Sequence, residues 1–111
     1  MINPGEANAQ SVLAALKERF TDAVSDGTGP MGDACAWVAR EKLFEAVRFL
    51  RDEQGFDLLA DETCVDRPER TPRFEVIYNL YSLSTHRRIF LKVLADDAPP
   101  GLPAGRDLPL L

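Results

Sequence analysis

Few side chains in this sequence could carry out catalysis, and they are scattered along the chain. There is one histidine, His86, and there are two cysteines, Cys35 and Cys64. A histidine that serves as a general base needs a second group to orient it. His86 is predicted to lie in a turn beside two arginines, far in register from any carboxylate. We therefore do not favour an enzyme built on Asp61, His86 or Cys64, and we assign no catalytic residue.

Four carboxylates between residues 57 and 66 could suggest a site for a hard cation, which prefers oxygen ligands. They are Asp57, Asp61, Glu62 and Asp66. The segment has no loop glycine, and a strand would divide these side chains between two faces. No metal site is therefore predicted. Without a secretory signal, the two cysteines are interpreted as small buried apolar residues rather than as a disulfide.

Residues 25–32 contain three glycines and a proline, which invites comparison with a phosphate-binding loop. Such a loop follows a strand and leads into a helix through a Lys-Ser/Thr pair, and neither feature is present. A flexible connector is the better interpretation. No cofactor is predicted from the residues.

The composition points to one small domain. The chain has 111 residues and a formal net charge of −5, which argues against a nucleic-acid partner because such a partner requires a basic face. No apolar run approaches the ~20 residues of a membrane span. The N-terminus lacks the basic and apolar regions of a secretory signal.

The residues from Phe74 to Ala95 are predicted to form a β-hairpin. Apolar side chains alternate along both halves, so the turn must keep core residues opposite core residues. A four-residue loop over 84–87 satisfies this requirement. It pairs Leu83 with Arg88, and it sets Leu80 against Leu91, Tyr78 against Val93 and Tyr81 against Phe90.

The remaining elements are predicted from the spacing of apolar residues and from the glycines and prolines that end helices and strands. We predict helices near 8–22, capped by Asn8, and near 40–53, whose apolar stripe is widened by Phe44. Strands are predicted near 34–38, 57–65, 74–83 and 88–95. The fold class is α+β, a four-stranded mostly antiparallel sheet with two helices packed on one face. Residues 1–95 form this domain, and 96–111 form a proline-rich tail.

The second face of the hairpin is also apolar, which is typical of a sheet that is covered by helices or presented to a partner. Its aromatic residues Tyr81 and Phe90 are candidates for a partner interface. The tail ends in apolar residues that a free tail has no reason to keep. Leu108, Leu110 and Leu111 are therefore added to this interface, with folding back onto the hairpin as the alternative.

Three segments, at 59–66, 72–83 and 87–93, follow one family in order and spacing. They read LADETCVD, PRFEVIYNLYSL and RRIFLKV. With them the chain resembles the 30-kilodalton subunit (the C subunit) of respiratory complex I, the proton-pumping NADH:quinone oxidoreductase. Residues 106–109 are similar to the linker that follows the hairpin in that family. The resemblance extends from about residue 33 to the end of the sequence, which lacks the aromatic, acidic and arginine-rich segment that opens the family's second half.

The resemblance implies a non-catalytic structural and assembly subunit of the hydrophilic arm. Such a protein carries no flavin, iron–sulfur cluster or quinone of its own. It packs against the large quinone-site subunit (the 49-kilodalton type) and contacts other subunits of the arm. It lies in the cytoplasm and reaches the membrane only indirectly, through the complex. The alternative is the equivalent subunit of a membrane-bound hydrogenase-type or other electron-transfer complex.

Overall fold

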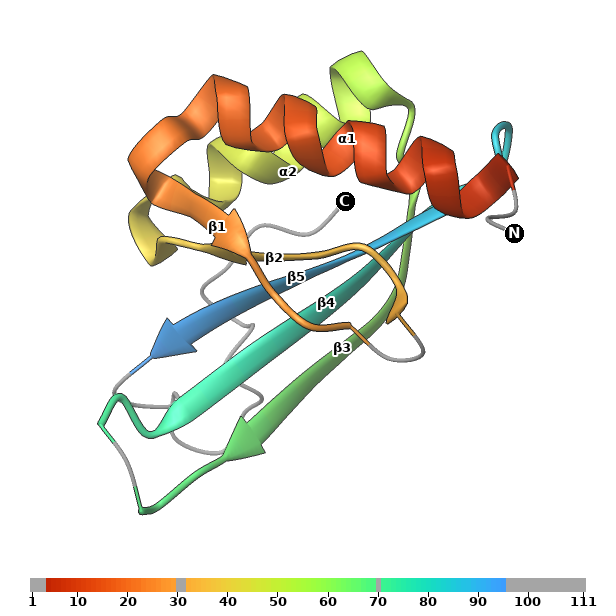
Figure 1. Ribbon diagram of the computed structural model, residues 1–111. Coiled ribbons are helices and arrows are strands. Elements are labelled where there is room, and N and C mark those ends of the chain that lie inside the picture. Colours follow the sequence, from red (N-terminus) through yellow and green to blue (C-terminus); the bar gives the residue numbers. More distant parts are fainter. Residues whose placement is uncertain (1–3, 30–31, 70, 96–111) are drawn as a thin grey trace.

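Two helices cover one face of a five-stranded sheet in the computed structural model of the chain (Figure 1). The structure describes residues 4–29, 32–69 and 71–95, with side chains from residue 9 onwards. The helices are α1 (Pro4–Phe20) and α2 (Leu43–Gln54), with 3-10 turns η1 (Thr21–Ala23) and η3 (Arg40–Lys42) beside them. The strands are β1 (Val24–Asp26), β2 (Cys35–Val38), β3 (Leu58–Asp66), β4 (Phe74–Ser82) and β5 (Arg87–Ala95). The predicted α+β class is confirmed.

The strands lie in the order β1-β2-β5-β4-β3. The predicted antiparallel meander of the last three strands is confirmed, and only the β2–β5 pairing is parallel. The strand β1 was not predicted, because part of it falls in the segment interpreted as a connector. Its three residues pair antiparallel with β2, from Val24 opposite Val38 to Asp26 opposite Ala36. The sheet is therefore mixed and has five strands instead of four.

In the hairpin, core residues lie opposite core residues as predicted, but the register is shifted by two residues. Tyr81 faces Arg88 and Leu80 faces Ile89, so the predicted pairings of Tyr81 with Phe90 and of Leu80 with Leu91 are wrong. The loop still has four residues, but it occupies 83–86 instead of 84–87. The buried Ser82 hydroxyl closes the turn early, because it accepts hydrogen bonds from the backbone N (3.3 Å) and the hydroxyl (2.7 Å) of Thr85.

Both helices begin at other residues than predicted, and α1 also ends earlier. Helix α1 starts at Pro4, where a proline suits the first helical position, so Asn8 lies within the helix and is not its N-cap. Helix α2 begins at Leu43 and ends at Gln54, close to its predicted end, and its C-cap is Gly55, whose φ of 75° is a left-handed conformation that glycine adopts without strain. Phe44 is 56% exposed and does not widen the buried stripe of α2.

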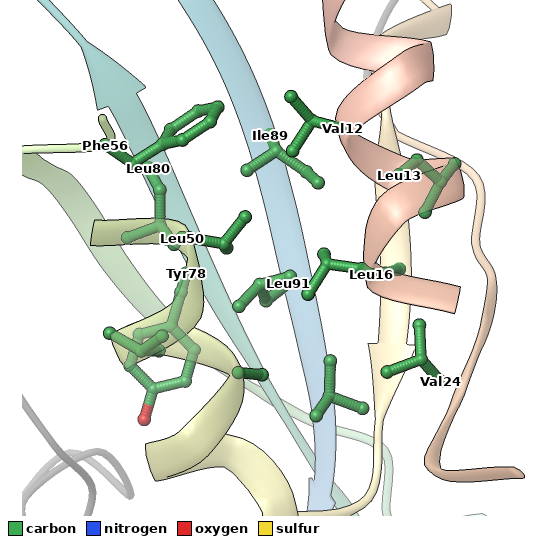
Figure 2. Packing of buried hydrophobic residues seen from close by; sticks show 14 of the residues in the cluster. Val12, Leu13, Leu16, Val24, Leu50, Phe56, Tyr78, Leu80, Ile89 and Leu91 are labelled. Atoms are coloured by element: carbon green, nitrogen blue, oxygen red, sulfur yellow. The ribbon is translucent and has the colours of Figure 1, made fainter. Parts of the chain in front are cut away.

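The core lies between the two helices and the sheet. Val12 and Leu16 of α1 and Leu50 of α2 point toward Ile89 and Leu91 of β5 (Figure 2). All five side chains are fully buried. The alternation that predicted the core face of the hairpin is thus confirmed for the two central strands.

A bulge explains the irregular pattern of β3. The pairing with β4 shifts between Leu59 and Asp61, which inserts one extra residue into β3. Leu59 and Cys64 consequently share the helix-covered face, where both pack against the core. Uninterrupted alternation would have placed these two residues on opposite faces.

Candidate functional site

The face of the sheet opposite α1 and α2, called the open face below, is the candidate site. Among the described elements, no helix covers it (Figure 1). Strand register determines which side chains it carries. From β2 to β5 they are Cys35, Trp37, Leu58, Asp61, Thr63, Val65, Glu75, Ile77, Asn79, Tyr81, Arg88, Phe90, Lys92 and Leu94. This mixture of aromatic, aliphatic and charged groups is suited to recognising a polypeptide partner rather than to catalysis.

The end of the open face nearest the hairpin loop is built around Tyr81. Its hydroxyl lies 3.1 Å from Nδ1 of His86, and the guanidinium carbon of Arg88 lies 5.3 Å from its ring centroid. Two aliphatic side chains near this end are accessible, since Leu58 is 40% and Leu83 is 58% exposed. We call Tyr81 and Arg88 the Tyr81–Arg88 pair.

Phe90 shares this face but is a poor contact residue. It is only 9% exposed, and it lies between Cys35 of β2 and Asn79 of β4. Its backbone N donates a hydrogen bond of 2.9 Å to Ala34 O. The structure therefore brings both predicted aromatic residues to one face but leaves only Tyr81 accessible.

A charged group fixes the middle of the open face. The Lys92 ammonium lies 3.8 Å from a Glu75 carboxylate oxygen and 5.4 Å from the centroid of the Trp37 ring. It also donates a hydrogen bond of 3.1 Å to Thr28 O. The Glu75 side chain is only 6% exposed and needs this compensation. Lys92 consequently ties the segment after β1 to the sheet.

The other end of the open face is hollowed. A groove of about 380 Å³ is lined by Trp37 and Leu94, together with Arg40 and residues of η1 and β1. Leu94 is 37% exposed. Aromatic and arginine side chains of this kind are enriched at protein interfaces.

The residues considered for catalysis or metal binding do not come together. Burial raises the pKa of the Cys35 thiol on the open face, whereas Cys64 lies on the helix-covered face. Asp57 accepts a hydrogen bond from Leu83 N, and Asp66 is paired with Arg73. Within residues 4–29, 32–69 and 71–95, no group of three or more His, Cys, Asp and Glu side chains could hold a metal ion.

Three residues of this face were not predicted from the sequence: Arg88, Trp37 and Lys92. With the correct register, Arg88 would have appeared opposite Tyr81, and alternation along β5 would have added Lys92. The position of Trp37 beside Lys92 could not be predicted from local sequence, because β2 joins β5 from a distant part of the chain. Leu108, Leu110 and Leu111 lie outside the described residues. In the part of the chain that the structure describes, no helix is long and apolar enough to cross a membrane.

The chain matches known proteins over most of its length. The model of the family described as "Respiratory-chain NADH dehydrogenase, 30 Kd subunit" matches residues 36–107. The C subunit of the NADH-quinone oxidoreductase of Roseiflexus sp. (strain RS-1) is 38% identical over 96 residues, which is 85% of this chain and 55% of the relative. The C subunit of the same enzyme from Geobacter sulfurreducens is 39% identical, and the match covers 83% of this chain and 57% of the relative. The chain thus spans little more than half the length of these relatives.

A solved structure shares the fold. It belongs to the membrane-bound sulfane sulfur reductase, described as an archaeal respiratory membrane complex. The TM-score is 0.63 at 16% identity, and the match covers 77% of this chain and 48% of that chain. At this identity the likeness concerns the fold alone.

Proposed function

Because the chain belongs to the family of the 30-kilodalton subunit of respiratory-chain NADH dehydrogenase, we propose that it is a structural and assembly subunit of such an enzyme. It works in the hydrophilic arm of a proton-translocating NADH:quinone oxidoreductase and performs no chemistry of its own. Through the complex it is held at the cytoplasmic face of the membrane. The observation that carries the proposal is the family match over residues 36–107, which spans β2 to β5.

The proposed partner is the large quinone-site subunit, with other hydrophilic-arm subunits nearby. The open face supports this choice, because it presents Tyr81 at one end and the groove at Trp37 and Leu94 at the other. Aromatic anchors set among aliphatic groups are typical of protein interfaces. The aromatic and aliphatic groups of the open face also favour a second cover, which a neighbouring subunit supplies.

The tail, residues 96–111, is proposed to add to the same interface. Each leucine side chain that it buries contributes roughly 1.5–3 kcal/mol, and its prolines reduce the entropy lost on ordering. Leu108, Leu110 and Leu111 are the expected contacts. Truncation after Asp97 tests this: the truncated chain should melt as before and bind the large subunit less tightly. Unchanged binding would assign the contact to the open face alone.

A second candidate is favoured by the solved structure with the same fold. That structure is of a membrane-bound sulfane sulfur reductase, so the fold also occurs in a respiratory complex with another substrate. The chain would then serve as the equivalent subunit of a hydrogenase-type or other electron-transfer complex. The chain would have the same structural role in that complex, and only the electron acceptor of the complex would differ.

Affinity purification from the source organism tests both candidates. A tagged copy of the gene replaces the original, and the membranes are solubilised in mild detergent. The proposed function requires the large quinone-site subunit among the purified proteins, with NADH:quinone oxidoreductase activity in the eluate. Deletion of the gene should lower that activity in the membranes. Recovery of hydrogenase-type subunits favours the second candidate, and a chain recovered alone contradicts both.

A further inference from the structure

We propose that the Tyr81–Arg88 pair is a pre-ordered anchor for a neighbouring subunit, and that it binds a segment carrying a carboxylate beside an apolar side chain. The inference rests on the proposed function, because it takes the partner to be a protein of the same complex. It adds the position of the contact on the open face and the chemistry of the partner. The Arg88 guanidinium binds the carboxylate, and the Tyr81 ring with Leu58 and Leu83 receives the apolar group.

The charge of Arg88 is the first argument. Among the described residues, no carboxylate lies within ion-pair distance of Arg88, whose guanidinium lies instead over the Tyr81 ring. Its neighbour Arg87 is used within the domain, where it donates a hydrogen bond to Gln54 O and lies over the Phe56 ring. In a chain of formal charge −5, Arg88 therefore presents an uncompensated positive charge on the open face. A guanidinium in this setting selects a carboxylate, with which it can form two parallel hydrogen bonds.

The order of the pair before docking is the second argument. The Tyr81 hydroxyl is held by Nδ1 of His86 at 3.1 Å, and its ring is covered on one side by Arg88 at 5.3 Å. The two residues are also direct cross-strand partners on rigid neighbouring strands. Side chains that are already fixed lose little conformational entropy on binding. Tyrosine and arginine in such a position have the composition of an interface hot spot.

The apolar surroundings are the third argument. Leu58, the cross-strand partner of Tyr81 on β3, is 40% exposed, and Leu83 in the hairpin loop is 58% exposed. The carboxylate of nearby Asp57 is already engaged by Leu83 N at 3.1 Å. A partner that offered only negative charge would leave both leucines uncovered. A carboxylate beside an apolar side chain matches both parts of the surface.

Zero-length cross-linking in the intact complex tests the proposal. The variant Arg88→Lys keeps the charge and adds an amine, which a carbodiimide joins to any carboxylate in direct contact. We expect a new link from position 88 to an Asp or Glu of another subunit, identified by mass spectrometry of the purified complex. The existing pair of Lys17 and Asp26, 3.0 Å apart, should be linked in every sample and serves as the reaction control.

Arg48→Lys is the matched control. Arg48 is an exposed arginine that also lies over an aromatic ring, that of Phe44 at 6.0 Å, but it projects from α2. Its guanidinium is 3.9 Å from Asp52, so the variant should give a link within the chain and none to another subunit.

The outcomes separate this inference from the proposed function. A link from position 88 to a second copy of this chain, or no link while Lys17 and Asp26 are joined, overturns the inference and leaves the proposed function intact. A chain that never enters the complex overturns both. The reversal Arg88→Glu should speed dissociation from the complex by on the order of tenfold, while Arg48→Glu leaves it unchanged. Equal dissociation of the two reversal variants, at equal melting temperatures, also overturns the inference.

Discussion

Replacing Leu80 with alanine tests whether position 80 belongs to the hydrophobic core. Leu80 is 1% exposed, faces Ile89 across the strands and lies beside Leu50 and Phe56 (Figure 2). The substitution removes three buried carbon atoms, which at roughly 0.8 kcal/mol each represent about 2.4 kcal/mol of transfer free energy. The cavity left behind adds to this, so the free energy of unfolding should fall by ~2–5 kcal/mol.

Urea denaturation followed by circular dichroism measures this loss, with the slope of the transition as a check that the unfolded state is unchanged. Leu83→Ala is the matched control, because Leu83 is three positions away but 58% exposed. It should change stability by no more than about 0.5 kcal/mol. A loss below about 1 kcal/mol for Leu80→Ala, or equal losses for the two variants, would refute the assignment of position 80 to the core.

Three further predictions concern Tyr78, Asp66 and the metal and flavin content of the purified protein. The Tyr78 hydroxyl is buried with no hydrogen-bond partner, so Tyr78→Phe should leave the free energy of unfolding unchanged or raise it. Burial, reinforced by the nearby Glu62 charge, raises the pKa of Tyr78 above its value in the unfolded chain. The folded state is therefore destabilised relative to the unfolded state as the pH rises above the unfolded pKa of this group. The variant Tyr78→Phe should reduce this alkaline loss of stability, measured by urea denaturation at a series of pH values. The hydrogen bond from Arg73 lowers the pKa of Asp66 below its value in the unfolded chain. This carboxylate therefore stabilises the fold at pH values above its unfolded pKa, and the stabilisation is lost as the pH falls through its folded pKa. In an NMR titration, Arg73→Gln should return the pKa of Asp66 toward its ordinary value. Protein purified without added metals should show no visible absorbance and no stoichiometric iron, zinc or flavin.

The hairpin shows how far alternation along a strand can predict a structure. The pattern of apolar residues determined which side chains of β4 and β5 face the helices. It could not determine the register, because a shift of two residues keeps every core residue opposite another core residue. The choice between the two registers depends on the turn, where the Ser82 hydroxyl binds Thr85 and His86 adopts a φ of 56°. Such local hydrogen bonds leave little trace in the hydrophobic pattern.

The edges of the sheet were harder to predict than its centre. Strand β1 has only three residues, and its pairing depends on β2, so nothing within Val24–Asp26 distinguishes it from a loop. In β3 the bulge next to Leu59 changes the phase of alternation. For the candidate site, alternation placed Tyr81 on the second face of the hairpin, and the register confirms that placement; its role at an interface stays a prediction. The low exposure of Phe90 could not be predicted, because Cys35, which lies beside it, comes from a strand that joins β5 across a long stretch of chain.

The central strand β5 contributes both to the core and to the open face. Ile89 and Leu91 are fully buried beneath the helices, while Phe90 on the opposite face is only 9% exposed. Lys92 then joins Glu75, Trp37 and Thr28 O, which holds the open face in one arrangement. A rigid face of this kind loses little entropy when a neighbour docks on it. The helix-covered face therefore provides the stability of the domain, and the open face provides a fixed surface on which the proposed partner can assemble.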